Sequence, residues 1–115
     1  MLFEFSISEK SKCTIVSLTG ELIEKNQAAD LIKKVEELVA AGNNKIALNL
    51  EGLKYMNSSG LNTLIQLLTK TRNSGGETVI YNMNKKINEL LLITKLNTLF
   101  KIVDSEDQAL KLLSV

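Results

Sequence analysis

Hydrophobic and polar residues alternate along much of the chain, and the period of the alternation predicts where strands and helices lie. Residues 2–7 and 13–18 alternate with a period of two, as half-buried strands do, and the polar residues 9–12 between them indicate a hairpin. The chain is expected to leave the second strand at 19–22. Further runs predict strands at residues 45–50, 78–83 and 100–103, with a connecting loop at residues 51–55.

Four other stretches carry apolar side chains three or four residues apart, the spacing that gives a helix one buried face. The first helix is expected at 27–41, with Asn26 as its N-cap and Gly42 just beyond its C-terminus. The other three are expected to begin near Leu61, to span 85–94 and to follow an N-cap at Ser105.

The predicted order is two strands and a helix, and then strand and helix in alternation to the end of the chain. Alternating strands and helices favour parallel pairing through right-handed crossovers, while the first hairpin adds an antiparallel strand. We therefore expect one α/β domain over residues 1–115. Its sheet should be mixed but mainly parallel, with about four to five strands and about four helices mostly on one face.

The composition narrows the classes of function. A net charge of +1, with acidic and basic residues interspersed, and an aromatic content of 4% argue against a nucleic-acid binder. No run approaches the ~20 apolar residues of a membrane span, and the first residues do not resemble a signal peptide. With Cys13 as the one cysteine, no internal disulfide can form, so we expect a cytoplasmic protein with Cys13 as a small buried strand residue.

The chain has no histidine, which excludes Ser-His-Asp triads, Cys-His pairs and histidine metal ligands. We therefore expect no catalytic residues, no metal and no cofactor. A serine nucleophile with a lysine base is the enzymatic alternative that is left. Lys54 is the lysine nearest in sequence to Ser58 and Ser59.

Residues 56–61 read Met-Asn-Ser-Ser-Gly-Leu and precede the second predicted helix. Ser58 and Ser59 would bring two hydroxyls to a helix N-terminus, where backbone N–H groups are unpaired and negative charge is favoured. The two serines are either a plain helix cap or a place that carries a phosphate. Tyr55 and Met56, directly before them, are either exposed beside the serines or packed in the core.

Three segments together resemble a known family. Residues 18–22 (Leu-Thr-Gly-Glu-Leu) look like its strand-exit motif, residues 46–53 (Ile-Ala-Leu-Asn-Leu-Glu-Gly-Leu) like its central strand, and residues 56–61 like its phosphorylation loop. In this order and spacing, over essentially the whole chain, they resemble the STAS domain, the sulfate transporter and anti-sigma factor antagonist domain. The likeness is strongest to the stand-alone bacterial anti-sigma factor antagonists.

The resemblance implies a regulatory cycle. In that family, the unmodified antagonist binds an anti-sigma factor with serine kinase activity and so releases a sigma factor. Phosphorylation of the antagonist ends the binding, and a PP2C-type phosphatase restores it. Carried over by position, the resemblance makes Ser58 the phosphorylated residue. It further implies a switch loop of Met56, Asn57, Ser59 and Gly60, and a partner-binding surface at Glu21, Ile23 and Leu61.

Two residues depart from the family's pattern. Asn57 stands where the family usually has aspartate, and Ile23 stands where it often has aspartate. Glu21 and Ile23 are accordingly either partner contacts or a simple strand exit. The alternative function, which Asn57 slightly favours, is a STAS subunit used constitutively in a transporter or a stressosome-like assembly. Neither function implies nucleic-acid binding or direct insertion into a membrane.

Overall fold

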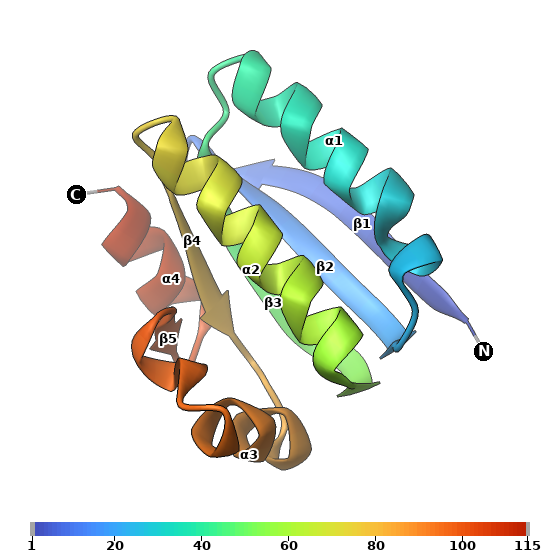
Figure 1. The fold of residues 1–115 in the computed structure, drawn as a ribbon. Coiled ribbons are helices and arrows are strands. Elements are labelled where there is room, and N and C mark those ends of the chain that lie inside the picture. The colour runs from blue at the N-terminus through green and yellow to red at the C-terminus, as the bar shows by residue number, and fades with distance from the viewer. Residues whose placement is uncertain (1, 115) are drawn as a thin grey trace.

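One mixed β-sheet organises the structure. A computed structural model describes residues 2–114, and in that part of the chain five strands form the sheet in the order β1-β2-β3-β4-β5 (Figure 1). β1 is antiparallel to β2, and the other neighbours are parallel, which confirms the predicted sheet with its N-terminal hairpin. The strands are β1 (Phe3–Lys10), β2 (Cys13–Leu22), β3 (Lys45–Met56), β4 (Glu77–Tyr81) and β5 (Lys101–Val103).

Helices pack unequally on the two faces of this sheet. In Figure 1, α1 and α2 lie in front of the sheet and α4 lies behind it. Apolar side chains of α1, α2 and α3 join the main core, whereas those of α4 join a smaller core on the opposite face, so the helices lie mostly on one face as predicted. The helices are η1 (Lys25–Ala28), α1 (Ala29–Ala40), α2 (Ser58–Asn73), α3 (Lys85–Ile93), η2 (Leu96–Thr98) and α4 (Glu106–Leu113), where η marks a short 3₁₀ helix.

The alternation of side chains along the strands divides the apolar residues between these two cores. In β2, Val16 and Leu18 belong to the main core, while Cys13 and Ile15 pack with α4. Cys13 is 2% exposed, which confirms its predicted place as a small buried strand residue. The three inner strands, β2, β3 and β4, therefore pack on both faces, and their ends are well-supported points from which a site can be built.

Two predicted strand ends are wrong in the same place. β2 continues through Leu22, and β3 continues through residues 51–55, which we expected to form a loop. The strands stay paired because β3 bulges: relative to β2 it holds one extra residue between Asn49 and Gly52 and another between Leu53 and Tyr55. Gly20 takes a φ of +97°, a left-handed conformation that glycine adopts at little cost. These irregularities interrupt the simple alternation that the sequence analysis relied on.

The start of the first helix is also corrected. The chain enters α1 through the 3₁₀ turn η1, and Asn26 caps neither: Glu24 is the N-cap of η1 and Ala28 is that of α1. Glu24 forms a capping box with Gln27, whose side chain accepts hydrogen bonds from two backbone N–H groups of the β2 exit. Gly42 does follow the helix in the left-handed conformation expected at that position, with a φ of +89°.

Candidate functional site

The predicted serine run lies where β2, β3 and α2 meet. The last residues of β2 pair with the last residues of β3, Glu21 with Tyr55 and Leu22 with Met56. The chain then turns directly into α2, and the backbone N–H of Asn57 donates to the carbonyl of Leu22 over 3.4 Å. The site therefore lies at the carboxyl ends of parallel strands, the edge where open α/β sheets most often bind their ligands.

Asn57 is the N-cap of α2 and holds three elements together. Its side-chain Oδ1 accepts a hydrogen bond from the N–H of Gly60 at 3.1 Å. Its Nδ2 donates to the carbonyl of Ile23, just beyond β2, at 2.9 Å. Its own carbonyl accepts the N–H of Leu61 at 2.9 Å. The interpretation of Ser58 or Ser59 as the plain helix cap is therefore wrong, because the neighbouring asparagine already does that work.

Ser58 and Ser59 are the first two residues of α2, and both are exposed. Within residues 2–114, neither hydroxyl makes a hydrogen bond. The backbone N–H groups of this first turn point along the helix axis toward solvent, apart from that of Gly60. The two hydroxyls are thus accessible, uncommitted and close to the positive end of the helix dipole.

Gly60 lets the start of α2 lie against the end of β2. A Cβ on this residue would stand 2.2 Å from the carbonyl oxygen of Leu22 and 2.8 Å from Cβ of Met56. Such distances leave no room for a side chain, so glycine is required for the packing and not for its backbone angles. The predicted switch loop is consequently the helix cap and first turn, fixed to the strand beneath it.

Met56 and Leu61 support this turn from below. Met56 is 1% exposed and Leu61 is 4% exposed, and both belong to the main core. Of the alternatives for Met56, core packing is the one that the structure has. The prediction that Leu61 contacts a partner is wrong for its side chain as it lies here, because no appreciable part of it reaches the surface.

Asn57 and Ile23, the two residues that depart from the family pattern, are joined by one hydrogen bond. Ile23 offers its carbonyl to Asn57, while the N–H groups of Ile23 and Glu24 donate to Oε1 of Gln27 at 2.9 and 3.0 Å. Aspartate at 57 could not donate to that carbonyl, whereas asparagine can. Glu21 and Ile23 are half-buried and lie beside the cap. The hydrogen bond from Asn57 to Ile23 was not predicted from the sequence, although asparagine is among the residues most favoured at an N-cap.

A groove with apolar walls lies between the end of β3 and α3. Tyr55, which precedes the cap, is 44% exposed, and Ile93 near the end of α3 is 79% exposed. Exposed apolar groups that gather beside a polar rim are typical of protein interaction sites. They line an open groove of about 310 Å³ formed by Tyr55, Met56, Lys86, Glu89, Leu90 and Ile93.

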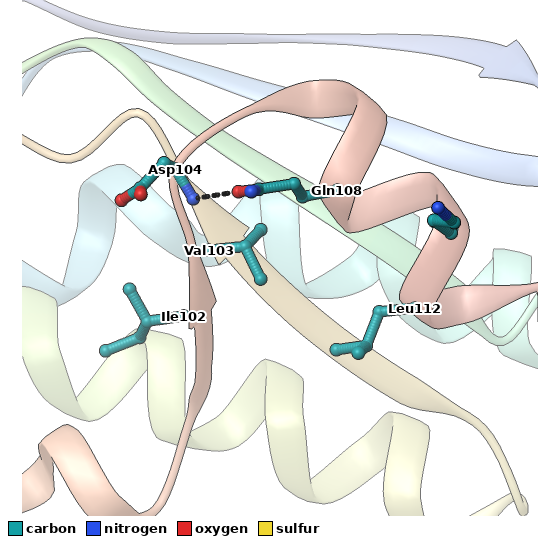
Figure 2. A pocket seen from close by; sticks show the side chains of 6 residues that line it. Ile102, Val103, Asp104, Gln108 and Leu112 are labelled. Carbon is teal, nitrogen blue, oxygen red and sulfur yellow. Dashed lines mark hydrogen bonds between the residues drawn. The ribbon is translucent and has the colours of Figure 1, made fainter.

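A larger hollow lies elsewhere, between β5 and α4 (Figure 2). Its volume is about 590 Å³, and its walls are mainly the apolar side chains of Ile102, Val103 and Leu112. Gln108, one of its polar lining residues, is already engaged, since its Oε1 accepts the N–H of Asp104 at 2.8 Å. This hollow is an open surface groove that does not touch the serine run.

The nucleophiles on the α4 face of the sheet are not activated. Burial, together with the nearby Glu106 carboxylate, raises the pKa of Tyr81 to about 12. Burial also raises the pKa of the Cys13 thiol above its ordinary value. Both groups are therefore protonated at neutral pH, and their part in the structure is packing.

Comparisons with known proteins agree with these observations. Residues 4–109 match the model of the STAS domain. An anti-sigma F factor antagonist of Paenibacillus polymyxa is 30% identical over 103 residues, which are 88% of this chain and 86% of that protein. The crystal structure of a provisionally named anti-sigma factor antagonist from Thermotoga maritima superimposes with a TM-score of 0.87 at 27% identity, covering 96% of this chain and 95% of that one.

A more distant structure shares the fold. SpoIIAA of Bacillus, solved in its phosphorylated form, superimposes with a TM-score of 0.72 at 19% identity and covers 94% of this chain and 97% of its own. Within residues 2–114, no helix has the length and apolar character needed to cross a membrane.

Proposed function

Because this chain belongs to the STAS domain family, we propose that it acts as an anti-sigma factor antagonist that phosphorylation of Ser58 switches off. The observation that carries the proposal is that, at the start of α2, one residue caps the helix and another presents an exposed hydroxyl. Asn57 caps the helix, so the adjacent Ser58 hydroxyl is exposed and has no structural task in the described chain. A kinase can reach such a hydroxyl without unfolding any element.

A phosphate on Ser58 would be compatible with the fold. It would carry about −1.5 to −2 charges at neutral pH, and it would stand at the positive end of α2. Favourable charge at a helix N-terminus contributes ~0.3–1 kcal/mol, and the unpaired N–H groups of the first turn offer donors. The first turn of α2 contains no acidic side chain that would repel the phosphate.

A partner packed on this turn would respond in the opposite way. Contact with Ser58, with the Glu21 and Ile23 surface and with exposed Tyr55 would require the partner to bury the phosphate. An unpaired buried dianion is strongly unfavourable. A loss of ~4 kcal/mol in binding corresponds to about a thousandfold weaker affinity. Local charge is then sufficient as a switch, and no refolding is needed.

The proposed partner is an anti-sigma factor with serine kinase activity, and a PP2C-type phosphatase would reverse the modification. The STAS chain itself contributes a binding surface and an acceptor hydroxyl. The chemistry of phosphoryl transfer and hydrolysis belongs to the two partner enzymes. Asn57 adds one specific feature, since the kinase would meet a neutral amide, engaged with Ile23, beside the acceptor.

Paired variants of the two neighbouring serines test the proposal. The protein from its own cells, grown under several conditions, is analysed by intact mass and peptide mapping, and Ser58→Ala is used as bait for the anti-sigma factor. We expect phosphate on Ser58 only. We also expect Ser58→Asp to bind the captured partner about a thousandfold more weakly than Ser58→Ala in calorimetry. Ser59→Asp is the matched control, because Ser59 is equally exposed one residue further on.

Two results would contradict the proposal. Equal affinity of Ser58→Asp and Ser58→Ala for the anti-sigma factor would show that charge at this position does not control binding. A complete absence of phosphate under all conditions, together with stable co-purification with a membrane transporter or a large assembly, would instead support a constitutive STAS subunit.

A further inference from the structure

The outer edge of β1 is open. β1 borders the sheet and pairs on one side with β2, so its other side has no strand beside it within residues 2–114 (Figure 1). The hairpin turn is the two-residue pair Ser11 and Lys12, both with positive φ, which makes Lys10 and Cys13 the first hydrogen-bonded pair. Alternation along the ladder then points the N–H and C=O groups of Phe3, Phe5, Ile7 and Glu9 outward.

This edge lacks several of the features that usually protect a strand from pairing. β1 is eight residues long, its register against β2 is unbroken, and the chain contains no proline. Its one lysine, Lys10, stands at the last position. The opposite edge is different, because β5 has three residues and offers little to pair with. Long, regular edges without bulges or proline are templates for another strand.

We propose that β1 is the surface through which two copies of this chain associate, by antiparallel pairing of β1 with β1 across a twofold axis at Ile7. The sheet would then run on continuously from one copy into the other. Phe3, Phe5 and Ile7, which are half-buried at the border of the main core, would gain a neighbouring apolar surface.

The face of the sheet to which each side chain points restricts the register of the β1–β1 pairing. Odd-numbered residues of β1 face the main core and even-numbered ones face the other side, so residues that pair must have numbers whose sum is even. Pairing about Ile7 satisfies this rule and places Glu4 opposite Lys10 twice, once on each side of the axis. Glu4 and Lys10 would form a non-hydrogen-bonded pair, in which side chains approach most closely.

Charge favours this register over those with the axis at Ser6 or Phe5, and an axis at Ser8 would bring Glu4 opposite Lys12, which lies in the turn beyond β1. Shifting the axis to Ser6 would place Glu4 opposite Ser8, and shifting it to Phe5 would place Glu4 opposite Ser6; both shifts lose the ion pairs. Lys10 already contacts Glu106 of α4 at 3.0 Å, with its Nζ exposed enough to serve a second acceptor. An ammonium group has three donors, so both carboxylates can be bound together.

Sedimentation equilibrium of the full chain, at concentrations up to about 1 mM, measures the association directly. Glu9→Pro is the decisive variant, since proline removes an outward N–H and leaves the pairing with β2 intact. We expect it to raise the dissociation constant of the dimer at least about tenfold relative to Glu9→Ala, which keeps the N–H. Circular dichroism of both variants verifies that each is folded.

Charge reversal tests the register. Glu4→Lys and Lys10→Glu should each weaken self-association, because each places two like-charge pairs across the axis. An equimolar mixture of the two variants should associate again, since every pair between them is of opposite sign. Ser58→Asp should not change the association, because β2 separates β1 from the strand that leads into α2.

Three results would overturn the inference. The first is that the wild-type chain remains monomeric up to about 1 mM. Alternatively, it associates and Glu9→Pro has the same dissociation constant as Glu9→Ala, which assigns the contact to another surface. Failure of the mixed charge variants to associate, while wild type does, would overturn the register about Ile7.

Discussion

The helices α2 and α3 begin in the same way. Each has an asparagine at its N-cap, and the Oδ1 of that residue accepts the N–H three positions on, at 3.1 Å from Gly60 in α2 and at 2.9 Å from Ile87 in α3. Each asparagine also uses its Nδ2 to hold a backbone carbonyl of a neighbouring segment. Asn57 binds that of Ile23, and Asn84 binds those of Leu53 and Lys54 near the end of β3.

The residues that follow the two caps differ. α2 continues with two serines and a glycine pressed against β2, whereas α3 continues with two exposed lysines and a buried isoleucine. Both caps are complete without these exposed residues. At α3 the exposed positions carry positive charge, while at α2 they carry neutral hydroxyls, one of which is the proposed phosphorylation site. At α2 the residue that caps the helix is therefore not the one proposed as the switch.

The largest difference between the two helix starts is expected at the third helical position. Gly60→Ala should destabilise the protein by about 3 kcal/mol, because the new Cβ would meet the Leu22 carbonyl at 2.2 Å and must push α2 away from β2. Alanine is normally the better helix former by about 1 kcal/mol, so the contact reverses the usual sign. Urea unfolding monitored by circular dichroism measures the change.

Gly42→Ala is the control for this variant. Gly42 has a φ of +89° but nothing within 4 Å of its ideal Cβ, so alanine there meets backbone strain without a clash. We expect a loss of about 1 kcal/mol. If Gly60→Ala costs no more than Gly42→Ala, the close approach of α2 to β2 does not determine the need for glycine.

Removing either cap should have the next largest effect. Asn57→Ala and Asn84→Ala each lose the cap, worth about 1 kcal/mol, and leave carbonyls without their amide donor, worth about another 1 kcal/mol. Asn84→Ala should be the more destabilising of the two, since Asn84 holds two carbonyls and Asn57 holds one. Urea denaturation of both variants ranks them, and the reverse order would show that the number of carbonyls held does not determine the cost of losing the cap.

The sequence predicted which strands and helices form better than it predicted the residues at which they begin and end. Alternation and helical spacing are local patterns, so they predicted the strands and helices. An asparagine three residues before Gly60 and another three residues before Ile87 are also local signals of an N-cap, but the prediction did not use them. The extension of β3 through residues 51–55 depends on bulges in β3 that keep it paired with β2, and that pairing is not local. Ser58 was placed correctly at a helix start. That its hydroxyl is not needed to cap the helix follows only from the side-chain contacts of Asn57, which the sequence does not show.

Asn→Asp substitutions separate the two tasks of each amide. Aspartate keeps the acceptor that caps the helix and loses the Nδ2 donor, so Asn57→Asp should cost about 1 kcal/mol through the bond to Ile23 alone. Asn84→Asp should cost more, because its carboxylate would face two carbonyl oxygens. Differential scanning calorimetry gives both values, and a stabilising Asn57→Asp would show that the link to Ile23 contributes little.

The smallest effect concerns charge at the first helical position. Ser58→Asp should change the free energy of unfolding by only about 0.5 kcal/mol, and in the stabilising direction, while Lys85→Glu should stabilise by about 1 kcal/mol because it also removes an unfavourable positive charge. Both gains should shrink in about 1 M NaCl, where the screening length falls to about 3 Å. Urea unfolding at low and high salt measures them. A marked destabilisation by Ser58→Asp would mean that negative charge disturbs the α2 cap itself, so that a phosphate would act by loosening the fold and not by excluding a partner from an unchanged surface.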